Sequence, residues 1–135
     1  MNDRVPDSRA AAAIGVVRAF LAALEARDVA AAQSHLAADA RIVVPGGRTV
    51  GSVRELVANS VGRYRAVGKH VERFDVVDGN DRVIVYCLGT LHGVWPDGTA
   101  FRGIRFIDRF ELRGDRIVLQ QVWNDAGEHR AARPA

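Results

Sequence analysis

The segment RFIDRFELRGDRIVLQQVWND, which runs from Arg105 to Asp125, predicts an antiparallel hairpin with its turn at Arg113-Gly114-Asp115. Its first half alternates apolar and charged residues with the period of two that indicates a strand buried on one face. Asp108 breaks the pattern, because it falls on the apolar side. The apolar residues that share its face are Ile104, Phe106, Phe110 and Leu112.

Two further turns precede this hairpin, at Asp78-Gly79-Asn80 and Pro96-Asp97-Gly98. The strand-like stretch HVERFDVVD leads into the first of these turns, and RVIVYCLGTLHGVW lies between the two. Glycine-bearing turns between long strand-like runs are typical of consecutive hairpins. The half of the chain after Gly68 therefore predicts four long antiparallel strands.

The first half of the chain is mainly helical in pattern. Apolar residues at helical spacing predict a first helix that ends near Arg27, followed by a short helix capped by Asp28. ARIVV and GRTVGS then indicate two short extended pieces. Ser52 caps a third helix, which we expect Gly68 to end. The inner face of the third helix comprises Val53, Leu56, Val57, Ser60, Val61 and Tyr64.

Helices followed by an antiparallel meander indicate an α+β fold. We expect one domain over residues 9–128, with an N-terminal tail at 1–8 and a loose C-terminal tail at 129–135 that lacks an apolar pattern. Because the helices can bury their apolar faces only against one face of the sheet, that sheet must curl around them.

Composition excludes several classes of function. The chain has 135 residues, a net charge of +3 and a sequence pI of about 9.7, with its arginines spread along the chain. Without a basic cluster we expect no nucleic-acid binding, and no run is long enough to span a membrane. The single cysteine, Cys87, lies in a strand-like run, which favours an inert thiol in a reducing, cytoplasmic location.

The order of helices and strands resembles that of the nuclear transport factor 2-like superfamily. VRAFLAALEARDVAAAQSHLAADARIVVP is similar to the opening of SnoaL-like and ketosteroid-isomerase-like proteins, and IDRFELRGDRIVLQQVWND to their closing hairpin. The resemblance implies a cone, in which a strongly curved antiparallel sheet wraps around three N-terminal helices as a cystatin-like α+β barrel. It also implies an interior pocket and a homodimer formed through the convex face of the sheet.

The resemblance also assigns roles to single residues. Asp108 matches the second acid of the ketosteroid isomerases, and Trp123 matches a tryptophan of the pocket. Phe20 stands where those enzymes carry the tyrosine of the oxyanion hole, and Val44 where they carry the general base. A base is needed to move the proton. Classical steroid isomerisation is therefore not expected, and the SnoaL-like cyclases, which carry an acid matching Asp108, are the closer comparison.

An acid on an apolar face is costly unless it pairs with a cation, faces a wet pocket or keeps its proton. Arg102 is a candidate cation for a purely structural pair with Asp108. For a functional site we predict Asp108 and His92 as catalytic residues. A structural role for His92 stays open. The predicted substrate-binding residues are Trp123, Phe20, Phe106, Phe110, Tyr64, Gln121 and Val44.

The expected function is a cofactor-free isomerase, cyclase or dehydratase acting on a small hydrophobic carbonyl compound. Asp108 would serve as acid/base or hydrogen-bond donor. No phosphate-binding glycine loop, dinucleotide motif or metal-ligand spacing is present in the sequence. The alternative is a non-catalytic domain of the same fold that binds a small ligand or dimerises. A cavity above roughly 300 Å³ that reaches Asp108 would favour the enzyme.

Overall fold

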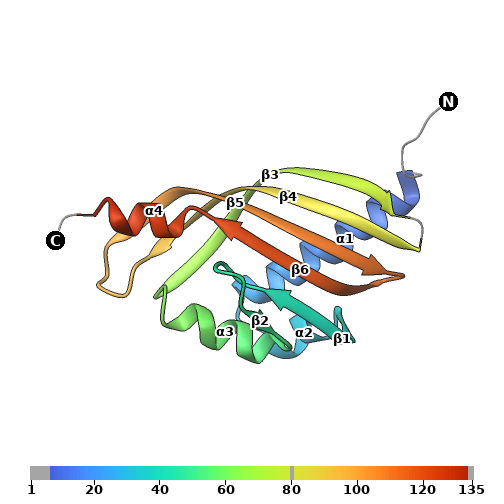
Figure 1. The fold of residues 1–135 in the computed structure, drawn as a ribbon, viewed down its shortest axis with the longest axis horizontal. Coiled ribbons are helices and arrows are strands. Elements are labelled where there is room, and N and C mark those ends of the chain that lie inside the picture. The colour runs from blue at the N-terminus through green and yellow to red at the C-terminus, as the bar shows by residue number, and fades with distance from the viewer. Residues whose placement is uncertain (1–6, 80, 134–135) are drawn as a thin grey trace.

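The computed structural model describes residues 7–79 and 81–133. Helices and short strands make up the first half of the chain, and four long strands then form a meander (Figure 1). They are α1 (Asp7–Glu25), α2 (Val29–Gln33), β1 (Leu36–Val43), β2 (Thr49–Val50), α3 (Val53–Val61), β3 (Ala66–Gly79), β4 (Arg82–Val94), β5 (Ala100–Arg113), β6 (Arg116–Asn124) and α4 (Ala126–Ala131).

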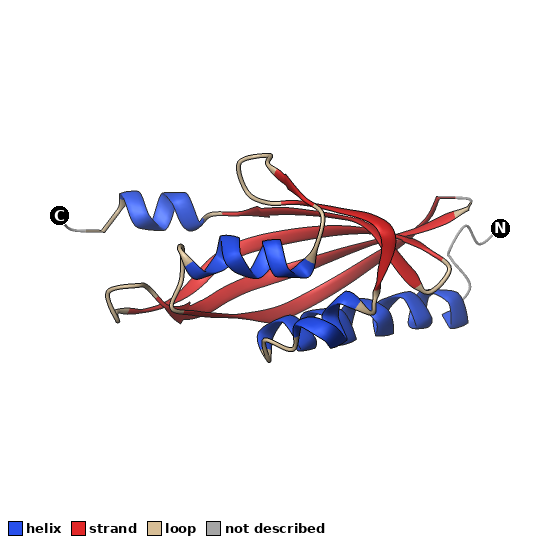
Figure 2. Ribbon diagram, turned by 90° about the horizontal axis from the view of Figure 1, so that it is seen from below, coloured by secondary structure: helices blue, strands red, loops and turns tan. Residues whose placement is uncertain are grey.

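The strands form one six-stranded sheet in the order β2-β1-β6-β5-β4-β3. The four long strands pair antiparallel as consecutive hairpins, as predicted, and β1 joins the sheet beside β6 in a parallel pairing. The strands bend strongly (Figure 2), and α1 runs diagonally behind the sheet in Figure 1. The expected α+β fold, with a curled sheet and N-terminal helices, is confirmed.

The core lies between the concave face of the sheet and the first helix. Val17 and Phe20 of α1 are fully buried, and the Phe20 ring meets Phe110 of β5 edge to face, with 6.1 Å between centroids. Alternate residues of β4 and β5 point to this core, as the period of a half-buried strand requires. Asp108 is among them, and its side chain is fully buried.

Local capping explains where the helices begin. The Asp28 carboxylate accepts a hydrogen bond from Ala31 N at 3.1 Å, and Ser52 Oγ accepts one from Glu55 N at 3.2 Å. Each side chain satisfies a free N–H of the first helical turn. Both predicted caps are confirmed, although α2 ends earlier than expected and β1 is correspondingly longer.

The predicted end of the third helix at Gly68 is wrong. Helix α3 ends at Val61, and β3 begins at Ala66. Aromatic packing explains the early end, because the buried Tyr64 ring stacks on Trp95 at 5.8 Å between centroids. Gly68 instead lies in β3 where a Cβ atom would collide with the Glu25 carboxylate and lie 2.7 Å from His92 Cε1. The absence of a side chain at Gly68 therefore lets Glu25 and His92 approach the backbone of β3, and it does not end a helix.

The C-terminal segment is also more ordered than expected. Helix α4 spans Ala126–Ala131, and the Arg130 guanidinium lies 5.2 Å from the centroid of the Trp95 ring. Arg133 pairs with Asp97 at 2.5 Å. The pKa of Asp97 is lowered to about 2, chiefly by its hydrogen bond from the backbone of Thr99 and also by Arg133. These contacts compensate for the missing apolar pattern.

Candidate functional site

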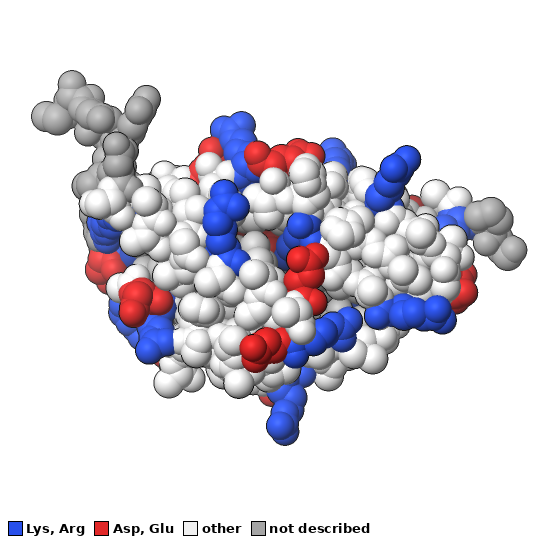
Figure 3. Space-filling view, turned by 180° about the vertical axis from the view of Figure 1, so that it is seen from behind, with Lys and Arg blue, Asp and Glu red and all other residues white. Residues whose placement is uncertain are grey.

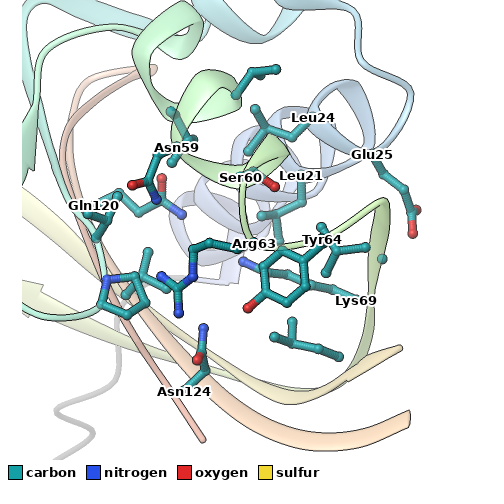
Figure 4. Close-up of a pocket in the computed structure, with 18 of the residues that line it drawn as sticks. Leu21, Leu24, Glu25, Asn59, Ser60, Arg63, Tyr64, Lys69, Gln120 and Asn124 are labelled. Atoms are coloured by element: carbon teal, nitrogen blue, oxygen red, sulfur yellow. The ribbon is translucent and has the colours of Figure 1, made fainter. Parts of the chain in front are cut away.

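A pocket of about 430 Å³ opens between α1, α3 and the concave face of the sheet. Most of its lining is apolar, with contributions from Leu21, Leu56 and Val122 among others. Figure 4 shows the polar side chains that enter it, and Figure 3 shows one face of the molecule hollowed near its centre, with basic side chains on both sides. The volume falls in the range of small-molecule sites.

The wall of this pocket contains an ion pair between Lys69 of β3 and Asp108 of β5. Lys69 lines the pocket, with 22% of its side chain exposed, whereas Asp108 is fully buried directly behind it. The Lys69 ammonium also lies 4.8 Å from the centroid of the Phe106 ring, in a cation–π contact. The apolar-face acid therefore pairs with a cation, and that cation is Lys69 instead of the exposed Arg102.

Three buried polar atoms near the pocket have no hydrogen-bond partner among the described residues. They are Tyr64 Oη, Asp108 Oδ1 and Gln120 Oε1. Buried polar groups are nearly always satisfied in native proteins. Tyr64 and Gln120 line the pocket, so a bound molecule or water can satisfy their two oxygens.

The pocket residues predicted from sequence divide into two groups. Val44 and Tyr64 line the pocket. Phe20, Phe106 and Phe110 are buried core residues that are not part of the lining, so their predicted direct contact with a substrate is not what the geometry shows. They form the hydrophobic layer behind the pocket and hold the strands that carry its polar groups.

The predicted placement of Trp123 and Gln121 on the concave wall is wrong. Trp123 is 54% exposed and pairs in register with Ile107 on the convex face, and Gln121 accepts a hydrogen bond there from Arg109 at 3.0 Å. The cause is a β-bulge. The pairing shifts between Glu111 and Leu112, so that consecutive Ile117 and Val118 are both buried.

This extra residue reverses the faces of the rest of β6. The residues that line the pocket from this strand are therefore Gln120, Val122 and Asn124.

His92 does not meet Asp108. It is exposed, it is paired in register with Gly68, and it lies five residues beyond Cys87, which is the register partner of Asp108 on β4. Its ring stands over Gly68 beside the Glu25 carboxylate. The predicted catalytic partnership of His92 with Asp108 is therefore contradicted by their positions.

The polar pocket residues that were not predicted from the sequence include Lys69, Gln120, Arg63 and Asn124. A signal for Lys69 existed, because it alternates with Val67 and Val71 and so shares their face of a strand. Ending the predicted helix at Gly68 left Val67 in the helix and so separated it from Lys69 and Val71. The β6 residues were missed because a bulge has no clear signature in this sequence.

The remaining reactive side chain is Cys87. It is buried on the concave face, and burial raises the pKa of its thiol to about 12, with a smaller contribution from the nearby Asp108. Such a thiol is a poor nucleophile. Within 7–79 and 81–133, no group of metal-ligating side chains is found, and no helix is long and apolar enough to cross a membrane.

Solved structures with the same fold are numerous. An NTF2-like protein of unknown function from Burkholderia pseudomallei has 20% identity and a TM-score of 0.73, with 92% of this chain and 98% of that chain covered. A protein from Jannaschia sp. CCS1, assigned as a SnoaL-like polyketide cyclase, has 16% identity and a TM-score of 0.71, with 99% and 100% covered.

A third structure is that of TerC co-crystallised with polyporic acid, with 19% identity, a TM-score of 0.73 and 89% and 96% of the two chains covered. At these identities the likeness concerns the fold. No curated protein matches the chain. The family model of the SnoaL-like domain matches residues 17–120. The match spans most of the helices and strands that enclose the pocket, and the chain therefore belongs to the SnoaL-like domain family.

Proposed function

We propose that the protein is a cofactor-free enzyme that moves a proton within a small, apolar carbonyl compound. The observation that carries the proposal is the Lys69–Asp108 pair in the wall of an apolar pocket of about 430 Å³. An ammonium group has three donors, so Lys69 can bind Asp108 and still donate to a substrate oxygen. The volume meets the criterion set from sequence, although the pocket reaches Asp108 only through Lys69.

In the proposed reaction Lys69, which lines the pocket, first passes a proton to the buried Asp108 behind it. The neutral Lys69 amine then accepts a proton from the carbon next to the carbonyl group, and the electron pair moves to the carbonyl oxygen. Lys69 stabilises the resulting enolate by charge and hydrogen bonding. Returning the proton at another carbon gives an isomerisation. Attack of the enolate on a second carbonyl, followed by proton return to the new alkoxide, gives a cyclisation.

The comparison with proteins assigned as polyketide cyclases favours the cyclisation. Classical steroid isomerisation is not proposed, because Val44 and Phe20 supply neither a base nor a hydroxyl group.

The test needs no knowledge of the natural substrate. 2-Tetralone in D2O exchanges the protons next to its carbonyl group, and proton NMR measures the rate. We expect the protein to accelerate the exchange, and Asp108→Asn to remove most of the acceleration, about a hundredfold. Asp115→Asn is the matched control, because Asp115 is exposed at the β5–β6 turn. An unaccelerated exchange with the wild-type protein would exclude the proposed enolisation.

A non-catalytic ligand-binding domain is the second candidate. It is favoured by the absence of a further acid or base beside the Lys69–Asp108 pair on the concave wall among the described residues, and by the fact that Asp108 already has Lys69 as a partner. Its signature is a thermal shift with 2-tetralone, without faster exchange.

We also propose a homodimer formed through the convex face of the sheet, in a cytoplasmic protein. Ile107 and Trp123 are register partners there and are 40% and 54% exposed. Exposed apolar groups rimmed by charged residues are typical of interfaces. Trp123→Lys should shift the mass measured by light scattering from dimer to monomer, and a monomeric wild-type protein would contradict the dimer.

A further inference from the structure

The polar groups at one end of the pocket are donors. Asn124 Oδ1 accepts a hydrogen bond from Ala126 N at 3.0 Å, which fixes the orientation of its amide. The Asn124 NH2 group therefore points away from Ala126, and Figure 4 shows its nitrogen directed toward the guanidinium of Arg63. Both side chains line the pocket.

Arg63 has no carboxylate partner within the part of the chain that the structure describes. Its guanidinium lies 5.8 Å from the centroid of the Tyr64 ring, and its side chain is only partly exposed. A partly buried guanidinium is costly without an anion, and its planar donors match a carboxylate.

The charges around the pocket are unbalanced. Arg18 and Arg27 also line it, and the charge of Lys69 is neutralised by Asp108. Glu25 is the one acidic residue in the described lining. Its side chain lies on the opposite side of the view from Asn124 in Figure 4. The end of the pocket at Arg63 and Asn124 is therefore complementary to a negative charge.

We infer that the ligand of this pocket is an apolar organic monoanion whose carboxylate binds Arg63 and Asn124. This inference rests on the proposed function and adds a second anchor point to it. The carbonyl group is held at Lys69, and the carboxylate fixes the orientation of the apolar body between the two. Lys69 selects for an oxygen and Arg63 for a charge, so that a neutral ester of the same shape loses only the second contact.

The test compares 2-naphthoate with methyl 2-naphthoate by calorimetry. We expect the wild-type protein to bind the acid at least about tenfold more tightly than the ester, because a hydrogen bond to a charged group is the stronger kind. Arg63→Met should abolish this preference, because it lowers the affinity for the acid and leaves the affinity for the ester unchanged. Arg63→Lys, which keeps the charge without the planar fork, should retain part of it.

The matched control is Arg54→Met, because Arg54 is an exposed arginine of α3, the helix that precedes Arg63, and is not part of the lining. It should leave both affinities unchanged. Equal binding of acid and ester by the wild-type protein, or an acid preference that survives in Arg63→Met, overturns the inference while the exchange assay with 2-tetralone can still succeed. Failure of both ligands to bind, together with no accelerated exchange, overturns the inference and the proposed function alike.

Discussion

Two neighbouring residues of β5 place their charges on opposite faces of the sheet, with different consequences. Asp108 points to the concave face, where it is fully buried and pairs with Lys69. Arg109 points to the convex face, where it binds Glu111 at 2.6 Å and Gln121 at 3.0 Å in a partly exposed network. On the convex face, charge is compatible with water. On the concave face, each charge depends on its partner.

This difference indicates that the functional site lies on the concave face of the sheet. A buried ion pair is weak evidence for stability, because desolvation offsets most of its attraction. A hydrophobic pair at the same place would serve the fold as well. The presence of Lys69 and Asp108 as a buried ion pair beside an apolar pocket is therefore better explained by chemistry than by packing.

The largest expected effect on the free energy of unfolding comes from comparing one aromatic residue on each face of the sheet. Phe110→Ala should lower the free energy of unfolding by about 4 kcal/mol, because it leaves a cavity beside Phe20. Trp123→Ala on the convex face should cost less than about 1 kcal/mol at concentrations where the chain is monomeric. Urea unfolding measures both, and similar costs would mean that Trp123 is packed in the core.

The next effect concerns the buried charge. Lys69→Met leaves Asp108 buried without its cation, and we expect a loss of about 3 kcal/mol at pH 7. Adding Asp108→Leu should restore most of the stability, because no unpaired charge remains. Denaturant unfolding of the single and double variants tests this, and a double variant less stable than Lys69→Met would contradict it.

The smallest effect belongs to the convex network. Hydrogen bonds from Arg109 and Arg82 lower the pKa of Glu111. Its contribution to the free energy of unfolding is therefore fully present above the unfolded pKa of about 4.3 and is lost as the pH falls through the lower folded pKa. Glu111→Gln should cost less than about 1 kcal/mol at pH 7, and that cost should decrease as the pH is lowered through the folded pKa. A cost that does not change with pH would show that charge is not what Glu111 contributes.

The candidate site was predictable only in part. Asp108 could be assigned to the concave face because β5 keeps a strict period of two through that region. Trp123 and Gln121 were assigned to the wrong face because one extra residue at Ile117 and Val118 changes the alternation, and both of these residues are apolar in either arrangement. His92 was paired with Asp108 by analogy, without a spacing that could test it.

The sequence by itself determined the α+β fold, the helix caps at Asp28 and Ser52, the three turns of the meander and the burial of an acid on β5. These features depend on local propensity and on periodicity, which are determined by residues close together in the sequence. The tertiary structure alone decided that Lys69 is the partner of Asp108, that β1 runs parallel to β6 and that Arg63 and Asn124 line the same pocket. Those contacts join residues far apart in the chain, and the bulge and curl of the sheet select them.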